Sequence, residues 1–308
     1  MDDAPYFADV AIGPRPSRCV WTRTSDDVTL RAATWESGPR GTVMLFQGRT
    51  EYIEKYSDAA AQLGRHGFAC AAIDWRGQGL SPRPARDRRL GHVGGFDEYQ
   101  RDVDALLEIA RAADLPRPWH VLGHSMGGAI ALRACMRQSV FRRAVFSAPM
   151  WGLTLRPHER VMGWGVSGLA SMLGLGERNT PGSGKSADPA GQPFEDNLLT
   201  TDPEMFAWMK RQIAEHPDLA LGGPSLSWLW AALREMHAMA RMAAPDLPAL
   251  TLLGTDERIV DSDAIHVRMN GWDGGTLEIV EGARHEVLME GEARRSALYD
   301  RIAAHLDG

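Results

Sequence analysis

Short apolar runs alternate with amphipathic stretches over the first half of the chain. The runs predict buried strands over residues 42–46, 68–73, 119–122 and 144–147. Alternating residues predict a further strand over 28–35, at an edge of the sheet, and residues 1–26 are expected to be irregular. Apolar residues at helical spacing predict a helix over 96–113, and further helices are expected over 53–67, which ends at a glycine, and over 129–136, which is rich in alanine and leucine. Strands that alternate with helices predict a mostly parallel sheet with helices on both faces.

The pattern changes between residues 150 and 236. This stretch contains no convincing strand, carries five of the ten tryptophans, and ends in apolar residues at helical spacing from Leu226 to Ala240. Within it, Pro181 to Lys185 predicts a flexible loop. The alternation then resumes, with strands at 249–253 and 276–280, a helix at 262–269 and a closing helix that runs to about residue 305. We therefore expect a core over 1–149, a helical insertion over 150–236, and the rest of the core over 237–308.

The composition indicates a globular protein and disfavours several classes of function. Of 308 residues, 44% are hydrophobic, and the net charge is −6, so we expect a large core and no nucleic-acid partner. The arginines between residues 83 and 89 are mixed with proline and aspartate, which is typical of a solvated loop. Cys19, Cys70 and Cys135 form no C-x-x-C pair, which disfavours disulfides and zinc. Without a visible signal peptide or an apolar run of about 20 residues, a cytoplasmic location is expected.

The stretch from Gly123 to Gly128 fits the pattern G-x-S-x-G, in which a serine lies on a tight turn between a strand and a helix. Ser125 is the predicted nucleophile. A serine hydroxyl needs a histidine to accept its proton and a carboxylate to orient that histidine. The partners follow the serine in chain order, each on a loop at the carboxyl end of a strand. Of the ten histidines, only His285 follows the last predicted strand, so it is the predicted base.

Two adjacent carboxylates compete for the third position. Asp256 and Glu257 both follow the strand predicted at 249–253. The usual spacing places the acid three residues after the strand-end glycine, Gly254, and three before a valine, Val260, which favours Glu257. Asp256 remains the alternative, because aspartate is the shorter and commoner acid.

Hydrogen-bond donors are also needed for the negative oxygen that forms during such a reaction. The first predicted donor is the backbone N–H of Met126, the residue after the serine. The second is the backbone N–H of Arg49, in the loop after the strand at 42–46. This chemistry requires no metal ion and no cofactor.

These motifs together resemble the α/β-hydrolase superfamily. Within it, the chain is similar to the monoacylglycerol lipase and bacterial lysophospholipase (serine aminopeptidase-like hydrolase) group. The matching stretches are Gly123 to Gly128, Gly254-x-x-Glu257-x-x-Val260, Ala283-Arg284-His285, Gly48 to Glu51, Asp74 to Ser81, Gly91-His92-Val93, Ala148-Pro149-Met150 and Gly222-Gly223-Pro224. The chain departs from the monoacylglycerol lipases at Gln47, where they usually carry histidine, and at Glu257, where they usually carry aspartate.

The resemblance implies an α/β-hydrolase fold with a helical lid, and a serine hydrolase that cleaves carboxylic esters of single-chain lipids. The lid is expected to form an acyl tunnel that includes Trp164, with Val161 to Gly176 lining it or touching the inner face of a membrane. The alternative is that the five tryptophans of the insertion only pack in its core. The Arg49 side chain is expected to hold an anionic head group, to pair with Glu51 or to be exposed to solvent. A small-ester esterase, a thioesterase and a carbon–carbon bond hydrolase are alternatives with the same triad. A binding protein on an inactive hydrolase fold is the alternative outside enzymes.

Overall fold

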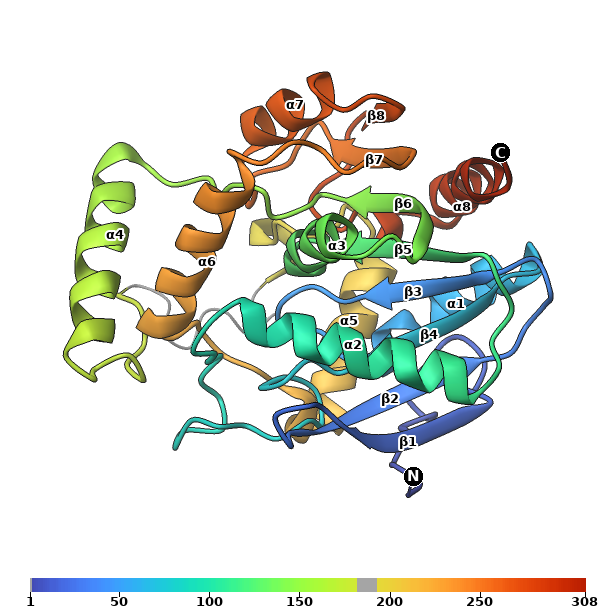
Figure 1. Cartoon of the computed structure of the whole chain (residues 1–308), viewed down its shortest axis with the longest axis horizontal. Helices are drawn as coiled ribbons and strands as arrows, with labels where there is room; N and C mark the ends of the chain where they lie inside the picture. The colour runs from blue at the N-terminus through green and yellow to red at the C-terminus, as the bar shows by residue number, and fades with distance from the viewer. Residues whose placement is uncertain (1, 182–192) are drawn as a thin grey trace.

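The computed structural model describes residues 2–181 and 193–308, and one eight-stranded sheet forms its centre (Figure 1). The strands are β1 (Arg18–Arg23), β2 (Thr29–Trp35), β3 (Thr42–Phe46), β4 (Ala69–Ile73), β5 (Trp119–His124), β6 (Phe141–Ser147), β7 (Ala249–Gly254) and β8 (Gly275–Val280). Their order across the sheet is β1-β2-β4-β3-β5-β6-β7-β8. β2 is antiparallel to both of its neighbours, and the pairings from β4 to β8 are parallel. The carboxyl ends of β4, β3, β5, β6, β7 and β8 therefore meet at one edge.

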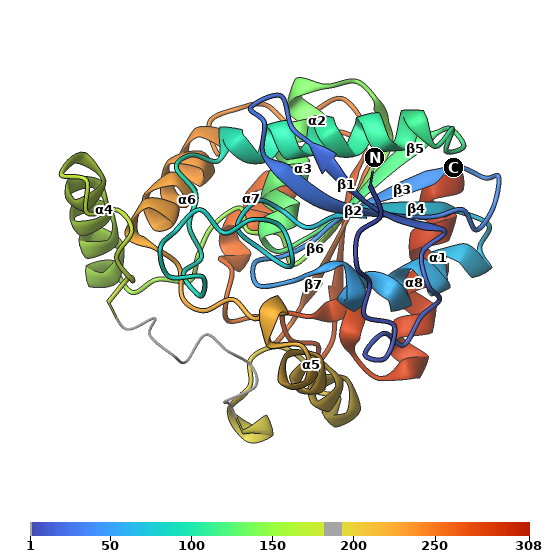
Figure 2. The same cartoon turned by 90° about the horizontal axis from the view of Figure 1, so that it is seen from below.

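Helices cover both faces of the sheet. The helices are α1 (Ser57–Arg65), α2 (Asp97–Ala112), α3 (Met126–Arg137), α4 (Pro157–Met172), α5 (Pro203–Glu215), α6 (Leu226–Met239), α7 (Ser262–Asn270) and α8 (Glu292–Asp307). The 3-10 turns among the described residues are η1 (Ile53–Tyr56), η4 (Phe194–Asp196), η5 (Pro217–Leu219) and η6 (Val287–Met289). α2 and α3 lie on one face, and α1 and α8 lie on the other (Figures 1 and 2). β3, β4 and β5 are buried along their whole length, as their continuous apolar runs predict.

The structure corrects the expectation for the first 26 residues, because β1 lies within them. β1 pairs with β2 in a register that sets Val20 opposite Ala32, so β1 and not β2 is the edge strand. Only Val20 of its six residues is buried. An exposed edge strand with a single buried side chain has too weak an apolar pattern to be recognised in the sequence.

Three helices, α4, α5 and α6, come from the stretch in which no strand was expected. The described residues between 150 and 236 add no strand to the sheet. α4 and α6 stand at the edge towards which the arrows of β3 and β6 point (Figure 1). The division into core and insertion remains a prediction, and its boundary after residue 236 falls inside α6. Residues 182–185 of the predicted flexible loop lie outside the described residues.

None of the helices in the described ranges has the length and apolar character that crossing a bilayer requires. The three cysteines are free thiols, and Cys70 and Cys135 are buried.

Candidate active site

Ser125 lies on the turn between β5 and α3 in a strained backbone conformation, with φ 49° and ψ −117°. The turn is tight because its neighbours leave no room for side chains. A Cβ at Gly127 would lie 2.0 Å from the carbonyl oxygen of Phe46, and one at Gly123 would lie 2.7 Å from that of Gly127. Both glycines of the G-x-S-x-G pattern are therefore required by packing, which also brings the end of β3 against the serine turn.

The side chains of Ser125, His285 and Glu257 form one hydrogen-bonded chain. Nε2 of His285 lies 2.9 Å from Oγ of Ser125, and Nδ1 lies 2.7 Å from Oε2 of Glu257. An ionised carboxylate only accepts hydrogen bonds, so Nδ1 carries a proton and Nε2 accepts the serine O–H. The three residues come from the loops that follow β5, β7 and β8. The arrangement can therefore move a proton from the serine oxygen to the imidazole.

Both oxygens of Glu257 have hydrogen-bond partners. Oε2 faces His285, and Oε1 accepts the N–H groups of Ile259 at 2.6 Å and Val260 at 3.1 Å. Burial alone would raise the pKa of Glu257, but the hydrogen bonds from His285 and the two N–H groups bring it below its ordinary value. The Glu257 side chain is 1% exposed, whereas Asp256 is exposed. Of the two competing carboxylates, the structure thus brings Glu257 to His285.

The loop after β3 lies beside Ser125, because β3 and β5 are parallel neighbours in the sheet. The N–H groups of Gly48 and Thr50 both donate to side chains. Between them, the N–H of Arg49 has no acceptor among the described residues, and the same holds for the N–H of Met126. Both predicted donors are therefore available for the oxygen of a reacting ester.

A cavity of about 740 Å³ opens at Ser125 and His285. Part of its wall comes from α4 and α6. The apolar residues of these two helices that line it include Met162, Val166, Leu226, Trp228 and Leu229. A cavity of this size and lining suits a small apolar ligand or a lipid chain.

Trp164 is not among the residues that line the cavity, which corrects the expectation that it would do so. Its ring packs against Trp230 at 5.3 Å and His237 at 5.6 Å, both edge-on. Trp228 and Val166 lie in the cavity wall instead. The sequence placed Trp164 in a helical insertion without a helix of defined bounds, and the contacts of α4 with α6 decide which side of α4 meets the cavity.

The Arg49 side chain reaches the segment that precedes α6. Its two terminal nitrogens donate to the carbonyl oxygen of Gly222 at 3.0 and 2.5 Å, and its guanidinium carbon lies 5.5 Å from the centre of the Trp228 ring. Burial lowers the pKa of Arg49 to about 10. The expected alternative of an ion pair with Glu51 is wrong, because Glu51 pairs with Lys55. A role for Arg49 in holding an anionic head group stays a prediction.

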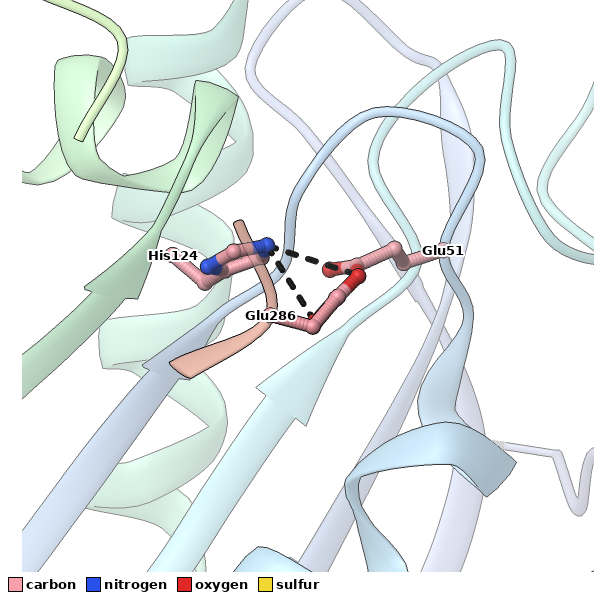
Figure 3. Close-up of side chains that lie close together, drawn as sticks. All are labelled: Glu51, His124 and Glu286. Carbon is pink, nitrogen blue, oxygen red and sulfur yellow. Dashed lines mark ion pairs between the residues drawn. The ribbon is translucent and has the colours of Figure 1, made fainter. Parts of the chain in front are cut away.

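Sequence reasoning missed a group of buried polar side chains beside the site (Figure 3). Glu51, His124 and Glu286 offer atoms within 4.8 Å of one another, and the ammonium of Lys55 pairs with both carboxylates. We refer to these four residues as the buried ion cluster. The available signal was their position in the sequence, since His124 precedes Ser125 and Glu286 follows the predicted base.

The chain is similar to several known proteins. The profile of the family described as "Serine aminopeptidase, S33" matches residues 37–292. "Lysophospholipase L2" of Escherichia coli (strain K12) is 30% identical over 295 residues, which cover 90% of this chain and 84% of that protein. "Monoacylglycerol lipase" of Mycolicibacterium smegmatis is 27% identical and covers 85% and 86%. The crystal structure of a soluble variant of monoglyceride lipase from Saccharomyces cerevisiae, in complex with a substrate analog, has the same fold, with a TM-score of 0.74, 19% identity and coverage of 99% and 98%.

Proposed function

Because the chain belongs to the serine aminopeptidase, S33, family, we propose that it is a serine hydrolase that cleaves carboxylic esters of single-chain lipids. The observation that carries the proposal is the hydrogen-bonded chain from Ser125 through His285 to Glu257. Two relatives bear the names lysophospholipase and monoacylglycerol lipase, and both names denote ester hydrolysis on lipids.

The reaction follows from the positions of these atoms. Oγ of Ser125 attacks the ester carbonyl carbon while Nε2 of His285 takes the hydroxyl proton. The N–H groups of Arg49 and Met126 donate to the negative carbonyl oxygen, and Glu257 stabilises the charged imidazole. The bond to the alcohol then breaks, and His285 gives its proton to the leaving oxygen. Water, deprotonated by His285, attacks the acyl-enzyme and releases the fatty acid and the free serine.

The cavity supports a lipid as the substrate. Ser125, His285 and apolar residues of α4 and α6 line the same cavity, so an acyl chain would lie against these helices while the ester lies at Ser125. A small-ester esterase, a thioesterase and a carbon–carbon bond hydrolase would use the same three residues and differ in substrate. We propose no cofactor and no metal ion for the reaction.

We also propose that α4 contacts a lipid surface. Val161, Leu169 and Met172 are 74%, 60% and 84% exposed, and none of them lines the cavity. They follow one another at spacings that place them on one side of the helix, outside the wall formed by Met162 and Val166. An apolar outer face next to a lipid-binding cavity suits a peripheral contact with the membrane from which the substrate is drawn.

The direct test is Ser125→Ala, assayed against lysophospholipids, monoacylglycerols, short-chain esters and acyl thioesters. The variant should fold as the wild type does and retain no more than a trace of turnover, because the attacking oxygen is gone. A fluorophosphonate should label the wild type and not the variant. Turnover that survives in Ser125→Ala would refute the mechanism, and a wild type that neither turns over nor becomes labelled would favour a binding protein.

A further inference from the structure

The buried ion cluster lies between the loops that carry the proposed catalytic groups. His124 is bonded in sequence to Ser125, and Glu286 is bonded to His285. The two histidine rings are 4.9 Å apart, and His124 is 5% and Glu286 7% exposed. Figure 3 shows the side chains of His124, Glu286 and Glu51 pointing towards one another. His124 is the last residue of β5, so the cluster joins the end of β5 to the loops that follow β3 and β8.

Glu51 anchors the loop that carries the Arg49 N–H. Its Oε2 accepts the N–H of Gly48 and, at 2.7 Å, the O–H of Tyr56. The loop packs directly onto this carboxylate, since a Cβ at Gly48 would lie 2.8 Å from Oε2. Gly48 shares a peptide bond with Arg49, so a displacement of the Glu51 carboxylate would displace the Arg49 N–H as well.

Lys55 and His124 hold the carboxylates of the cluster. The Lys55 ammonium pairs with Glu51 and, at 2.5 Å, with Glu286. Nε2 of His124 lies 3.3 Å from Glu286 and 3.9 Å from Glu51, while Nδ1 donates to the carbonyl oxygen of Ser147. Burial alone would lower the pKa of His124, but Glu286 and Glu51 raise it above its ordinary value. Both carboxylates thus have the Lys55 ammonium and the His124 ring beside them.

The side-chain atoms of Glu51, His124 and Glu286 are arranged as in a metal site, but the Lys55 ammonium already lies against both carboxylates. Two carboxylates and one imidazole within 4.8 Å have the composition of a divalent-metal site. Lys55 contacts both carboxylates, so a metal ion would have to displace a buried ammonium. The ammonium between the two carboxylates therefore indicates a structural role and not a metal site.

The loop after β3 carries the Arg49 N–H, and we call it the oxyanion loop. We propose that Glu51 is a positioning residue for this loop, and that Lys55 and His124 hold Glu51 in place. The carboxylate fixes Gly48, and Gly48 fixes the neighbouring Arg49 N–H towards the reacting oxygen. This inference rests on the proposed function, because the oxyanion loop matters only where Ser125 attacks a carbonyl.

The test compares Glu51→Ala and Glu51→Gln with the wild type in ester hydrolysis, with Ser125→Ala in parallel. Glu51→Ala should lower kcat about 10²-fold, the cost of misplacing a reacting group by roughly 1 Å, and leave KM close to the wild-type value. Glu51→Gln should retain more of kcat than Glu51→Ala, because its amide oxygen can still accept the Gly48 N–H. The melting temperature of each variant shows that the measured protein is folded.

Glu54→Gln is the matched control. Glu54 is fully buried, lies three residues further along the chain, and pairs with Arg31 at 2.7 Å, away from the serine. It should lower the melting temperature and leave kcat unchanged. Folded Glu51 variants with wild-type kcat would overturn this inference alone, and so would a Glu54→Gln variant that loses as much kcat as Glu51→Ala. A wild type that hydrolyses no ester would overturn the inference together with the proposed function.

Discussion

At the scale of single residues, the choice between two adjacent carboxylates can be tested directly. Glu257 hydrogen-bonds to His285, whereas Asp256 is exposed. Glu257→Gln should lower kcat by about 10⁴-fold, as expected for a lost triad acid, because the amide no longer fixes the imidazole tautomer. Asp256→Asn should leave kcat nearly unchanged in the same ester assay. The opposite ranking of the two variants would transfer the role to Asp256.

Glu257 also predicts a dependence of stability on pH. Its pKa in the folded protein is lower than its ordinary value of 4.5, so the folded state favours the ionised carboxylate. This contribution to stability is present above about pH 4.5 and is lost as the pH falls through the folded-state pKa. The difference in melting temperature between the wild type and Glu257→Gln should therefore be largest near neutral pH and shrink on acidification. A difference that stays constant from pH 7 to pH 3 would contradict this assignment.

The sequence placed the three proposed catalytic residues together more readily than their surroundings. Ser125, His285 and Glu257 each follow a strand, and parallel strands bring their carboxyl ends to one edge, where the three side chains form hydrogen bonds. The contacts of Glu51 and His124 depend on how the loops after β3 and β8 fold against the end of β5. No periodicity or spacing encodes that arrangement, and the cluster was therefore found only in the structure.

At the scale of elements, α4 presents different side chains to the cavity and to its neighbouring helix. Val166 lines the cavity, whereas Trp164 packs against Trp230. Val166→Trp should fill part of the cavity and shift the activity towards shorter acyl chains. Each methylene that loses its contact should cost about 0.8 kcal/mol, or roughly fourfold in kcat/KM. A series of acyl esters of increasing length measures the shift.

Trp164→Ala is the control on the same helix. This substitution removes a large side chain two residues from Val166. It should lower stability without changing how activity depends on the length of the acyl chain. If Trp164→Ala shortened the preferred chain and Val166→Trp did not, the cavity wall would have been assigned to the wrong side of α4.

The accuracy of the predicted elements depends on burial. The runs at β3, β4 and β5 are buried throughout, and their predicted bounds differ from the observed ones by no more than two residues. The sequence did not predict β1, because a single buried valine forms no periodic pattern of apolar residues. The spacing of apolar residues indicates which side of an element is buried. An edge strand with few buried residues has almost no such spacing.

At the scale of the whole molecule, hydrogen bonds to backbone carbonyl groups join the segments before α5 and α6 to the loops of the site. The N–H of Glu286 donates to the carbonyl oxygen of Leu199 at 2.7 Å, and the hydroxyl of Thr200 donates to that of Met289 at 2.7 Å. The Arg49 side chain connects the loop after β3 to the carbonyl oxygen of Gly222. The segments before α5 and before α6 thus hold the loops that carry His285 and Arg49, so they contribute to the geometry of the site as well as to the cavity.

The outer face of α4 leads to the last prediction, which concerns the contact between the molecule and a lipid surface. Val161→Asp should weaken binding to phosphatidylcholine vesicles about tenfold, because burying a valine contributes at least about 1.5 kcal/mol and an aspartate forfeits it. These vesicles carry no net charge, so they neither attract nor repel the chain's net charge of −6. Hydrolysis of a water-soluble ester should not change, since Val161 lies outside the cavity wall.

Val267 provides a control of the same residue type and exposure. It is also 74% exposed, but it lies on α7, away from α4 (Figure 1). Val267→Asp introduces the same charge and should leave vesicle binding at the wild-type level, because α7 would not face the lipid. Co-sedimentation with vesicles measures both variants. An equal loss in the two would indicate a general effect of added negative charge, and no loss in either would remove α4 from the contact with the membrane.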